Sequence, residues 1–174
     1  MLTAISRSRM QLEGASREAE GYLELGMHDQ ALRSLQRRGK LVHGDGHACY
    51  LMGECLREMR RYHEAIYPLR RSVELDPKPC ESWLALGWCY KRTGRLDEAI
   101  RALQRAGDFA PDQALVQYNL ACYHSLAGER MAALRRLKRA LDLDRSLAAL
   151  VADEPDFDAM RADPALRMLL AAPR

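Results

Sequence analysis

Thiols and imidazoles are the side chains best able to do nucleophilic or acid–base chemistry in this 174-residue sequence. Cys122 and His124 lie two residues apart. On a helix they point to different faces, so they cannot act on each other as nucleophile and base. A second group lies close in the sequence but matches no spacing of metal ligands: His43, His47, Cys49 and His63.

Other signatures of catalysis are missing from the sequence. It contains no phosphate-binding loop, no dinucleotide-binding glycines and no serine elbow. Its five cysteines are odd in number and include no CxxC pair, which argues against a disulfide framework and against a structural zinc site. We therefore predict that the protein is not an enzyme and that it uses no metal and no cofactor.

Binding chemistry is better represented than catalytic chemistry. Trp88 lies close to Lys91 and Arg92, and a tryptophan with a neighbouring arginine is the usual composition of a binding hot spot.

The net charge of +3 is too small to indicate a nucleic-acid or membrane partner. No apolar run approaches the roughly 18 residues that span a bilayer, and the N-terminus lacks the apolar stretch of a secretory signal. We therefore expect a cytoplasmic protein.

The elements that position these side chains follow from a period of 34 residues in the sequence. One column of the self-alignment holds only alanine: Ala31, Ala65, Ala99 and Ala133. Another column holds only leucine: Leu35, Leu69, Leu103 and Leu137. Self-similarity at this period is typical of stacked helical hairpins, because one hairpin cannot bury its apolar face alone.

The period divides the chain into four repeats of 34 residues: 12–45, 46–79, 80–113 and 114–147. A helical extension at 1–11 precedes them, and a cap and tail at 148–174 follow. Each repeat is expected to hold a helix A, a turn and a helix B. Position eight is small in every repeat and position twenty is always alanine, which lets the two helices approach closely.

Glycine marks the turn in three of the four repeats, at repeat position fifteen. These residues are Gly26, Gly94 and Gly128, and Arg60 breaks the column. A helix C-terminus needs a left-handed residue at this point, and glycine adopts that conformation without strain.

The third repeat resembles a tetratricopeptide repeat at most of its defining positions: Trp83, Leu86, Gly87, Tyr90, Gly94, Ala99, Leu103, Ala106 and Pro111. The second repeat follows the same pattern, whereas in the fourth Gln117 and His124 stand where the pattern has large apolar side chains. The resemblance implies an all-α fold, a right-handed α-solenoid of four helix-turn-helix hairpins with a C-terminal helical cap.

The segment after the fourth repeat is similar to the one that closes many bacterial tetratricopeptide proteins. It has an acidic stretch, Arg161 and the Asp163–Pro164 step. The resemblance implies that it covers the exposed face of the last repeat. In the alternative, it folds back into the binding groove as a built-in ligand.

Members of this family bind with the concave surface, which is lined by positions two, five, six, nine, twelve and thirteen of helix A. The resemblance therefore implies a scaffold or adaptor with a groove for a peptide or helical segment. Its lining would consist of Tyr50, Glu54, Arg57, Leu84, Trp88, Lys91, Arg92, Tyr118, Asn119 and Cys122. Aromatic residues next to cations suit a partner with an apolar anchor and acidic flanks.

The best-known ligand mode of the family, a clamp on a C-terminal carboxylate, is not expected. It needs lysine, asparagine and arginine at positions two, five, six and nine. Only Arg17 and Asn119 fit, and Glu20 and Glu54 would repel a carboxylate. Binding of a chaperone tail is therefore disfavoured.

Other interpretations remain open at this stage. Trp88, Tyr50 and Tyr118 could serve only helix packing, and the protein could be a dedicated secretion-type chaperone or a self-associating assembly factor. We expect a monomer or a weak homodimer.

One segment of the fourth repeat is basic: Arg130, Arg135, Arg136, Lys138 and Arg139. Acidic residues nearby favour a salt-bridged or solvated face over a nucleic-acid site.

Overall fold

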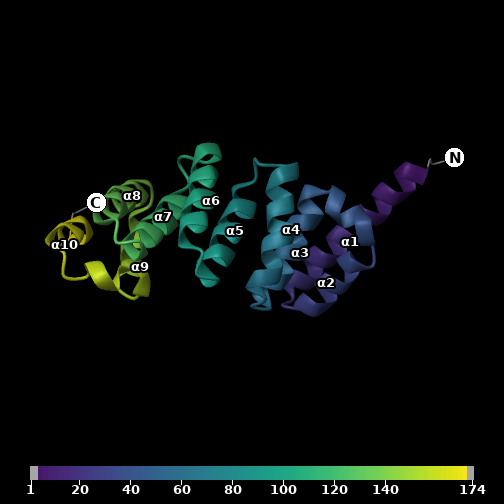
Figure 1. The fold of residues 1–174 in the computed structure, drawn as a ribbon, viewed down its shortest axis with the longest axis horizontal. Helices are drawn as coiled ribbons and strands as arrows, with labels where there is room; N and C mark the ends of the chain where they lie inside the picture. Colours follow the sequence, from purple (N-terminus) through teal and green to yellow (C-terminus); the bar gives the residue numbers. More distant parts are fainter. Residues whose placement is uncertain (1–3, 172–174) are drawn as a thin grey trace. The chain divides into compact units, whose positions relative to one another are not determined.

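The computed structural model describes residues 4–171 and is helical throughout (Figure 1). This confirms the prediction of an all-α fold, since the described residues contain no strand. The chain divides into two compact units, Met1–Gly94 and Arg95–Arg174, and each unit is described by itself. No helix in the described part is long and apolar enough to cross a membrane.

The first unit holds five α-helices and one short 3₁₀ helix. They are α1 (Ala4–Glu24), α2 (His28–Gln36), η1 (Gly39–Gly44), α3 (Gly46–Glu58), α4 (Tyr62–Leu75) and α5 (Cys80–Arg92). Helix α1 pairs with α2 and α3 pairs with α4, and α5 packs against α4. Helix α1 also contacts α3, and α3 contacts α5, so the first helices of successive hairpins lie side by side.

The second unit begins with α6 (Leu96–Phe109), α7 (Ala114–Leu126) and α8 (Arg130–Leu143). Helix α7 pairs with α8 and also contacts α6. Four short elements follow: η2 (Arg145–Leu147), α9 (Ala148–Val151), η3 (Pro155–Met160) and α10 (Pro164–Ala171).

The core of each hairpin consists of the residues that recur every 34 positions. All four alanines of position twenty and all four leucines of the second column are fully buried. Gly53 shows why the facing position must be small, since a Cβ on it would lie 2.4 Å from Cγ of Leu69. That separation is far below van der Waals contact, so a larger residue would force α3 away from α4.

The segment after α8 covers both helices of the last hairpin. Phe157 of η3 is fully buried and packs edge-on against Tyr118 of α7, with ring centroids 6.1 Å apart. Arg145 donates hydrogen bonds of 2.8 and 2.6 Å to the backbone oxygens of Leu169 and Leu170, which hold the end of α10. The segment thus caps the unit and also lies against its helix A.

The turns that follow α1, α3, α5 and α7 share one backbone conformation. Gly26, Gly94 and Gly128 have φ angles of +69°, +77° and +73°, as the glycine column predicts. Arg60 occupies the same place with φ +59°. The break in the glycine column therefore changes the residue but not the turn, and a side chain is held in a conformation that glycine adopts more easily.

We expect Arg60→Gly to stabilise the protein by about 0.5–1 kcal/mol. Relief of the left-handed strain, about 1–2 kcal/mol, exceeds the extra chain entropy that glycine loses on folding. Urea unfolding measures the change. Arg60→Ala is the matched control, because it removes the same side chain but keeps a Cβ; equal stabilisation by both substitutions would contradict the backbone explanation.

Most of the cysteines are core residues rather than reactive groups. Four of the five thiols are buried, and Cys80 is half-buried. Burial raises the pKa of the Cys49 thiol to about 11 and that of the Cys55 and Cys89 thiols to about 12. These three thiols are therefore protonated at neutral pH and are poor nucleophiles.

Ellman's reagent should modify Cys80 fastest in the native protein and the other four thiols only as the chain unfolds. Absorbance at equal pH with and without denaturant measures this difference. In Cys80→Ser the fast phase should disappear. Rapid modification of several thiols in that variant would show that the hairpin cores open easily.

Candidate functional site

The first unit gathers seven of the ten residues that the sequence places in a binding groove. Three lie on α3 and four on α5, whose contact with each other is direct. These residues are Tyr50, Glu54, Arg57, Leu84, Trp88, Lys91 and Arg92. The other three, Tyr118, Asn119 and Cys122, belong to α7 in the second unit.

On α3 the predicted residues form one interacting group. Tyr50 is half-buried and stacks on the ring of His47, with centroids 6.4 Å apart. Burial, followed by the charge of Glu54, raises the pKa of Tyr50 to about 12, so its hydroxyl is neutral at physiological pH. The group offers a flat aromatic surface with a hydrogen-bonding edge.

Arg57 is already committed to carboxylates of its own helix. Its Nε and Nη2 atoms donate to the two carboxylate oxygens of Glu54 at 2.8 and 2.9 Å, and Nη2 also donates to Glu58 at 2.5 Å. The hydrogen bond to Glu54 is the main reason that the pKa of Arg57 lies above its usual range. This cation is therefore compensated and offers less attraction to an acidic partner than the sequence alone indicates.

On α5 the predicted side chains differ in their exposure to solvent and in the groups that they contact. Trp88 is 38% exposed, and the Lys91 ammonium lies 5.5 Å from its ring centroid. Arg92 instead stacks on Tyr62 of α4, at 5.3 Å from the ring centroid. Leu84, one turn before Trp88, is half-buried. Trp88 is thus the large aromatic surface that this helix presents to solvent.

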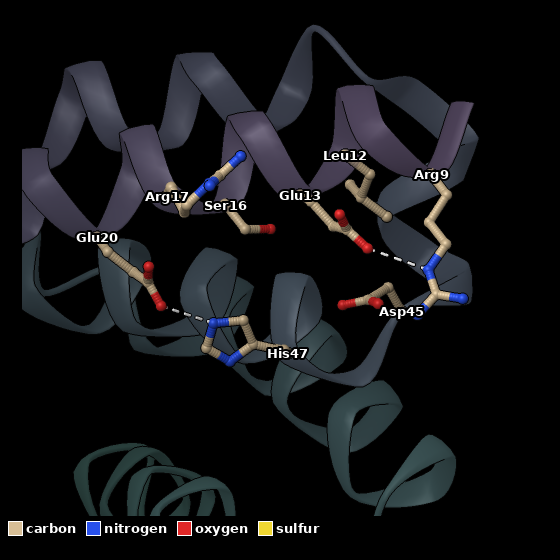
Figure 2. Close-up of a pocket in the computed structure, with 8 residues that line it drawn as sticks. All are labelled: Arg9, Leu12, Glu13, Ser16, Arg17, Glu20, Asp45 and His47. Atoms are coloured by element: carbon tan, nitrogen blue, oxygen red, sulfur yellow. Dashed lines mark hydrogen bonds and ion pairs between the residues drawn. The ribbon is translucent and has the colours of Figure 1, made fainter. Parts of the chain in front are cut away.

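A pocket of about 390 Å³ lies between α1 and the start of α3 (Figure 2). It is lined by Arg9, Leu12, Glu13, Ser16, Arg17, Glu20, Asp45 and His47. The dashed lines in Figure 2 mark an ion pair between Nε of Arg9 and Glu13 at 3.0 Å and a hydrogen bond between Nε2 of His47 and Glu20 at 2.8 Å. The pocket therefore carries both signs of charge.

A smaller pocket of about 260 Å³ adjoins the first at His47. Its lining is Gly46, His47, Tyr50, Ser72, Asp76, Pro79, Glu81 and Ser82. His47 is not among the ten predicted groove residues, although it holds repeat position two, which lines the concave surface in this family. Glu20, which lines the first pocket, and Trp88 occupy equivalent places in their repeats, since both hold position nine.

The three groove residues of the second unit are placed differently. Tyr118 and Cys122 are 4% and 2% exposed, and Asn119 is half-buried. Burial is the main cause of the raised pKa of Tyr118, whose ring is covered by Phe157. A partner could reach Tyr118 and Cys122 only after η3 had moved, because the chain's own segment occupies this surface.

One group of side chains could in principle hold a metal ion. The donor atoms of Cys122, Glu154 and Asp156 lie within 4.8 Å of one another. Glu154 already accepts a hydrogen bond of 3.2 Å from the backbone N–H of Asp156, which caps the start of η3. This capping role gives Glu154 a structural reason to be there, and we assign no metal to the group.

Comparison with known families identifies a tetratricopeptide repeat at residues 56–121. No curated protein matches the sequence. Several solved structures share the fold. MamA of Desulfovibrio magneticus RS-1 is 22% identical over 77% of this chain and 76% of its own, with a TM-score of 0.71.

Two further similar structures are tetratricopeptide repeat proteins whose descriptions mention a peptide. YrrB, a protein with an unusual peptide-binding site, is 25% identical over 78% of this chain and 70% of its own, with a TM-score of 0.70. The second such domain of human RPAP3, solved with the HSP70 peptide SGPTIEEVD, is 16% identical over 67% of this chain and 97% of its own, with a TM-score of 0.63. Residues 56–121 thus carry tetratricopeptide repeat sequence, and most of the chain has the fold of tetratricopeptide repeat structures.

Proposed function

We propose that the protein is a non-enzymatic interaction scaffold and that its first unit binds a peptide or helical segment of a partner protein. The proposed surface is the inner face formed by α1, α3 and α5. Similarity to YrrB and to the RPAP3 domain supports peptide binding as the general activity. The half-exposed indole of Trp88 is the observation that carries the proposal for this chain.

The repeat columns relate Trp88 to the pockets of the same unit. Position nine holds Glu20 at the first pocket, Glu54 beside Tyr50, and Trp88 on α5. Position five holds Ser16, Tyr50 and Leu84, of which two line the pockets. Equivalent positions on three adjacent helices thus supply two pockets and one exposed aromatic side chain, a combination suited to an extended ligand.

The proposed ligand carries an apolar anchor for Trp88 and Tyr50. Acidic flanks would meet Lys91 and Arg17, the latter exposed on the first pocket, rather than Arg57. Because Glu20, Glu54 and Glu81 lie along the same surface, the flanking charges should set the position of the peptide more than its affinity.

The two tryptophans should respond differently when the stability of the protein is measured. Trp83 donates a hydrogen bond of 2.8 Å from Nε1 to the backbone oxygen of Pro77, and its loss removes both packing and this bond. Trp83→Ala should lower the free energy of unfolding by about 3–5 kcal/mol. Trp88→Ala should lower it by about 1 kcal/mol or less, because Trp88 is 38% exposed and does not belong to the buried core. Urea unfolding of both variants compares them.

Binding itself is tested with peptides selected from a random library against the wild-type protein. Trp88→Ala should weaken the affinity for a selected peptide at least about tenfold in calorimetry, since tryptophans that become buried in an interface are frequent hot spots. Met131→Ala, which removes another exposed apolar side chain from α8, is the control and should bind as the wild type does. Equal affinity of the Trp88→Ala and wild-type proteins would reject this surface.

A further inference from the structure

The fourth repeat exchanges a tryptophan for an amide but keeps the hydrogen bond of the indole. In the third repeat, Nε1 of Trp83 donates to the oxygen of Pro77 at 2.8 Å. Exactly one period later along the chain, Nε2 of Gln117 donates to the oxygen of Pro111 at 3.3 Å. The same bond is made by a smaller side chain, which fills less space beside α7 than an indole would.

A cleft lies beside Gln117, between α6, α7 and α8 of the second unit. It consists of two adjoining hollows of about 630 and 600 Å³. Both are lined by Gln104, Pro111, Gln117 and Arg136. Its size is in the range of sites for small ligands.

Arginines dominate the polar lining of the cleft. Arg101 and Arg105 come from α6, and Arg135, Arg136 and Arg139 come from α8. The repeat columns relate these helices, since Arg101 and Arg135 share one position and Arg105 and Arg139 share another. The basic segment noted in the sequence therefore does not stand alone, because α6 brings two more cations to it.

Carboxylates neutralise only part of this charge. Arg105 pairs with Asp108 at 3.1 Å and Arg139 with Asp112 at 2.5 Å. Within residues 4–171, no carboxylate pairs with Arg101, Arg135 or Arg136. The sequence predicts a salt-bridged or solvated face, and in the cleft Arg105 and Arg139 are the arginines with a carboxylate partner among the described residues.

Gln117 also orients one of the arginines that lack a carboxylate. Its Oε1 accepts a hydrogen bond of 3.0 Å from Nη1 of Arg136, while its Nε2 is fixed by Pro111. Because Gln117 is 4% exposed and bound at both ends, the Arg136 guanidinium is held in place before any ligand arrives. Like charges gathered in this way repel one another, and an anion would relieve that repulsion.

We propose that this cleft binds the phosphate groups of a compact ligand, such as a nucleotide or another diphosphate. A guanidinium presents two parallel N–H donors that match phosphate oxygens, and several guanidiniums can share one diphosphate. A long polyanion fits less well, because Asp108, Asp112 and Glu129 border the cleft and interrupt the positive surface. The proposal is independent of the peptide surface on the first unit.

Titration calorimetry with pyrophosphate and with ATP tests the proposal on the full chain at low and physiological salt. The double variant Arg101→Ala/Arg135→Ala should weaken both ligands at least about tenfold, because each arginine contributes charge-assisted hydrogen bonds. Lys138→Ala is the matched control, since it removes a cation of α8 that is paired with Asp142 outside the cleft. Equal losses in the control and the double variant would indicate diffuse attraction and overturn the proposal.

A second variant tests the cleft by filling it. Gln117→Trp restores the side chain of the third repeat, so it should keep the helical circular dichroism spectrum and the melting temperature while pyrophosphate binding disappears. Undiminished binding in a folded Gln117→Trp protein would contradict the site. If Gln117→Trp does not fold, the double variant Arg101→Ala/Arg135→Ala, which changes two exposed side chains, tests the site by itself.

Two other anions separate the ligand classes. A decaglutamate peptide and a single-stranded RNA are titrated under the same conditions. Tighter binding of pyrophosphate or ATP than of either polymer supports a compact phosphate ligand, and preference for ATP over pyrophosphate points to a nucleotide. Stronger binding of the peptide or the RNA, or no binding of any phosphate compound, would overturn it.

Discussion

Each hairpin holds together because its helix A approaches its helix B closely. This approach requires a very small residue on one helix and a fully buried alanine on the other, as Gly53 and Ala65 show in the hairpin of α3 and α4. Leu69 fills the space that Gly53 leaves. The same small and large residues recur every 34 positions, since each hairpin must solve the same packing problem before it can stack on the next.

Positions outside this packing are free to vary, and they carry the properties that distinguish the protein. Trp88 takes a position that holds glutamate in the first two repeats, and it faces solvent. Gln117 takes a position that holds tryptophan in the third repeat, and it lines a cleft among arginines. One fold accommodates both features, because residues outside the hairpin core can change without disturbing the core packing.

The period predicts the helices and their turns well, because both depend on local sequence and on contacts that repeat. It could not show that Arg60 would adopt the conformation of a turn glycine, which the flanking helices impose. Nor could it show that Tyr118 lies beneath Phe157, or that Arg57 is held by Glu54. These details depend on the fold of a non-repeating segment and on the choice between competing charge pairs, and neither has a periodic signal.

If the inner face of the first unit binds a ligand, Trp88 should become buried in the complex. Trp83→Phe leaves Trp88 as the single tryptophan of the chain, so the fluorescence of that variant reports on one side chain. Addition of a peptide that binds the protein should shift the emission of Trp88 to shorter wavelength and protect it from acrylamide quenching, because the indole becomes buried. Unchanged emission and quenching at saturating peptide would contradict the account.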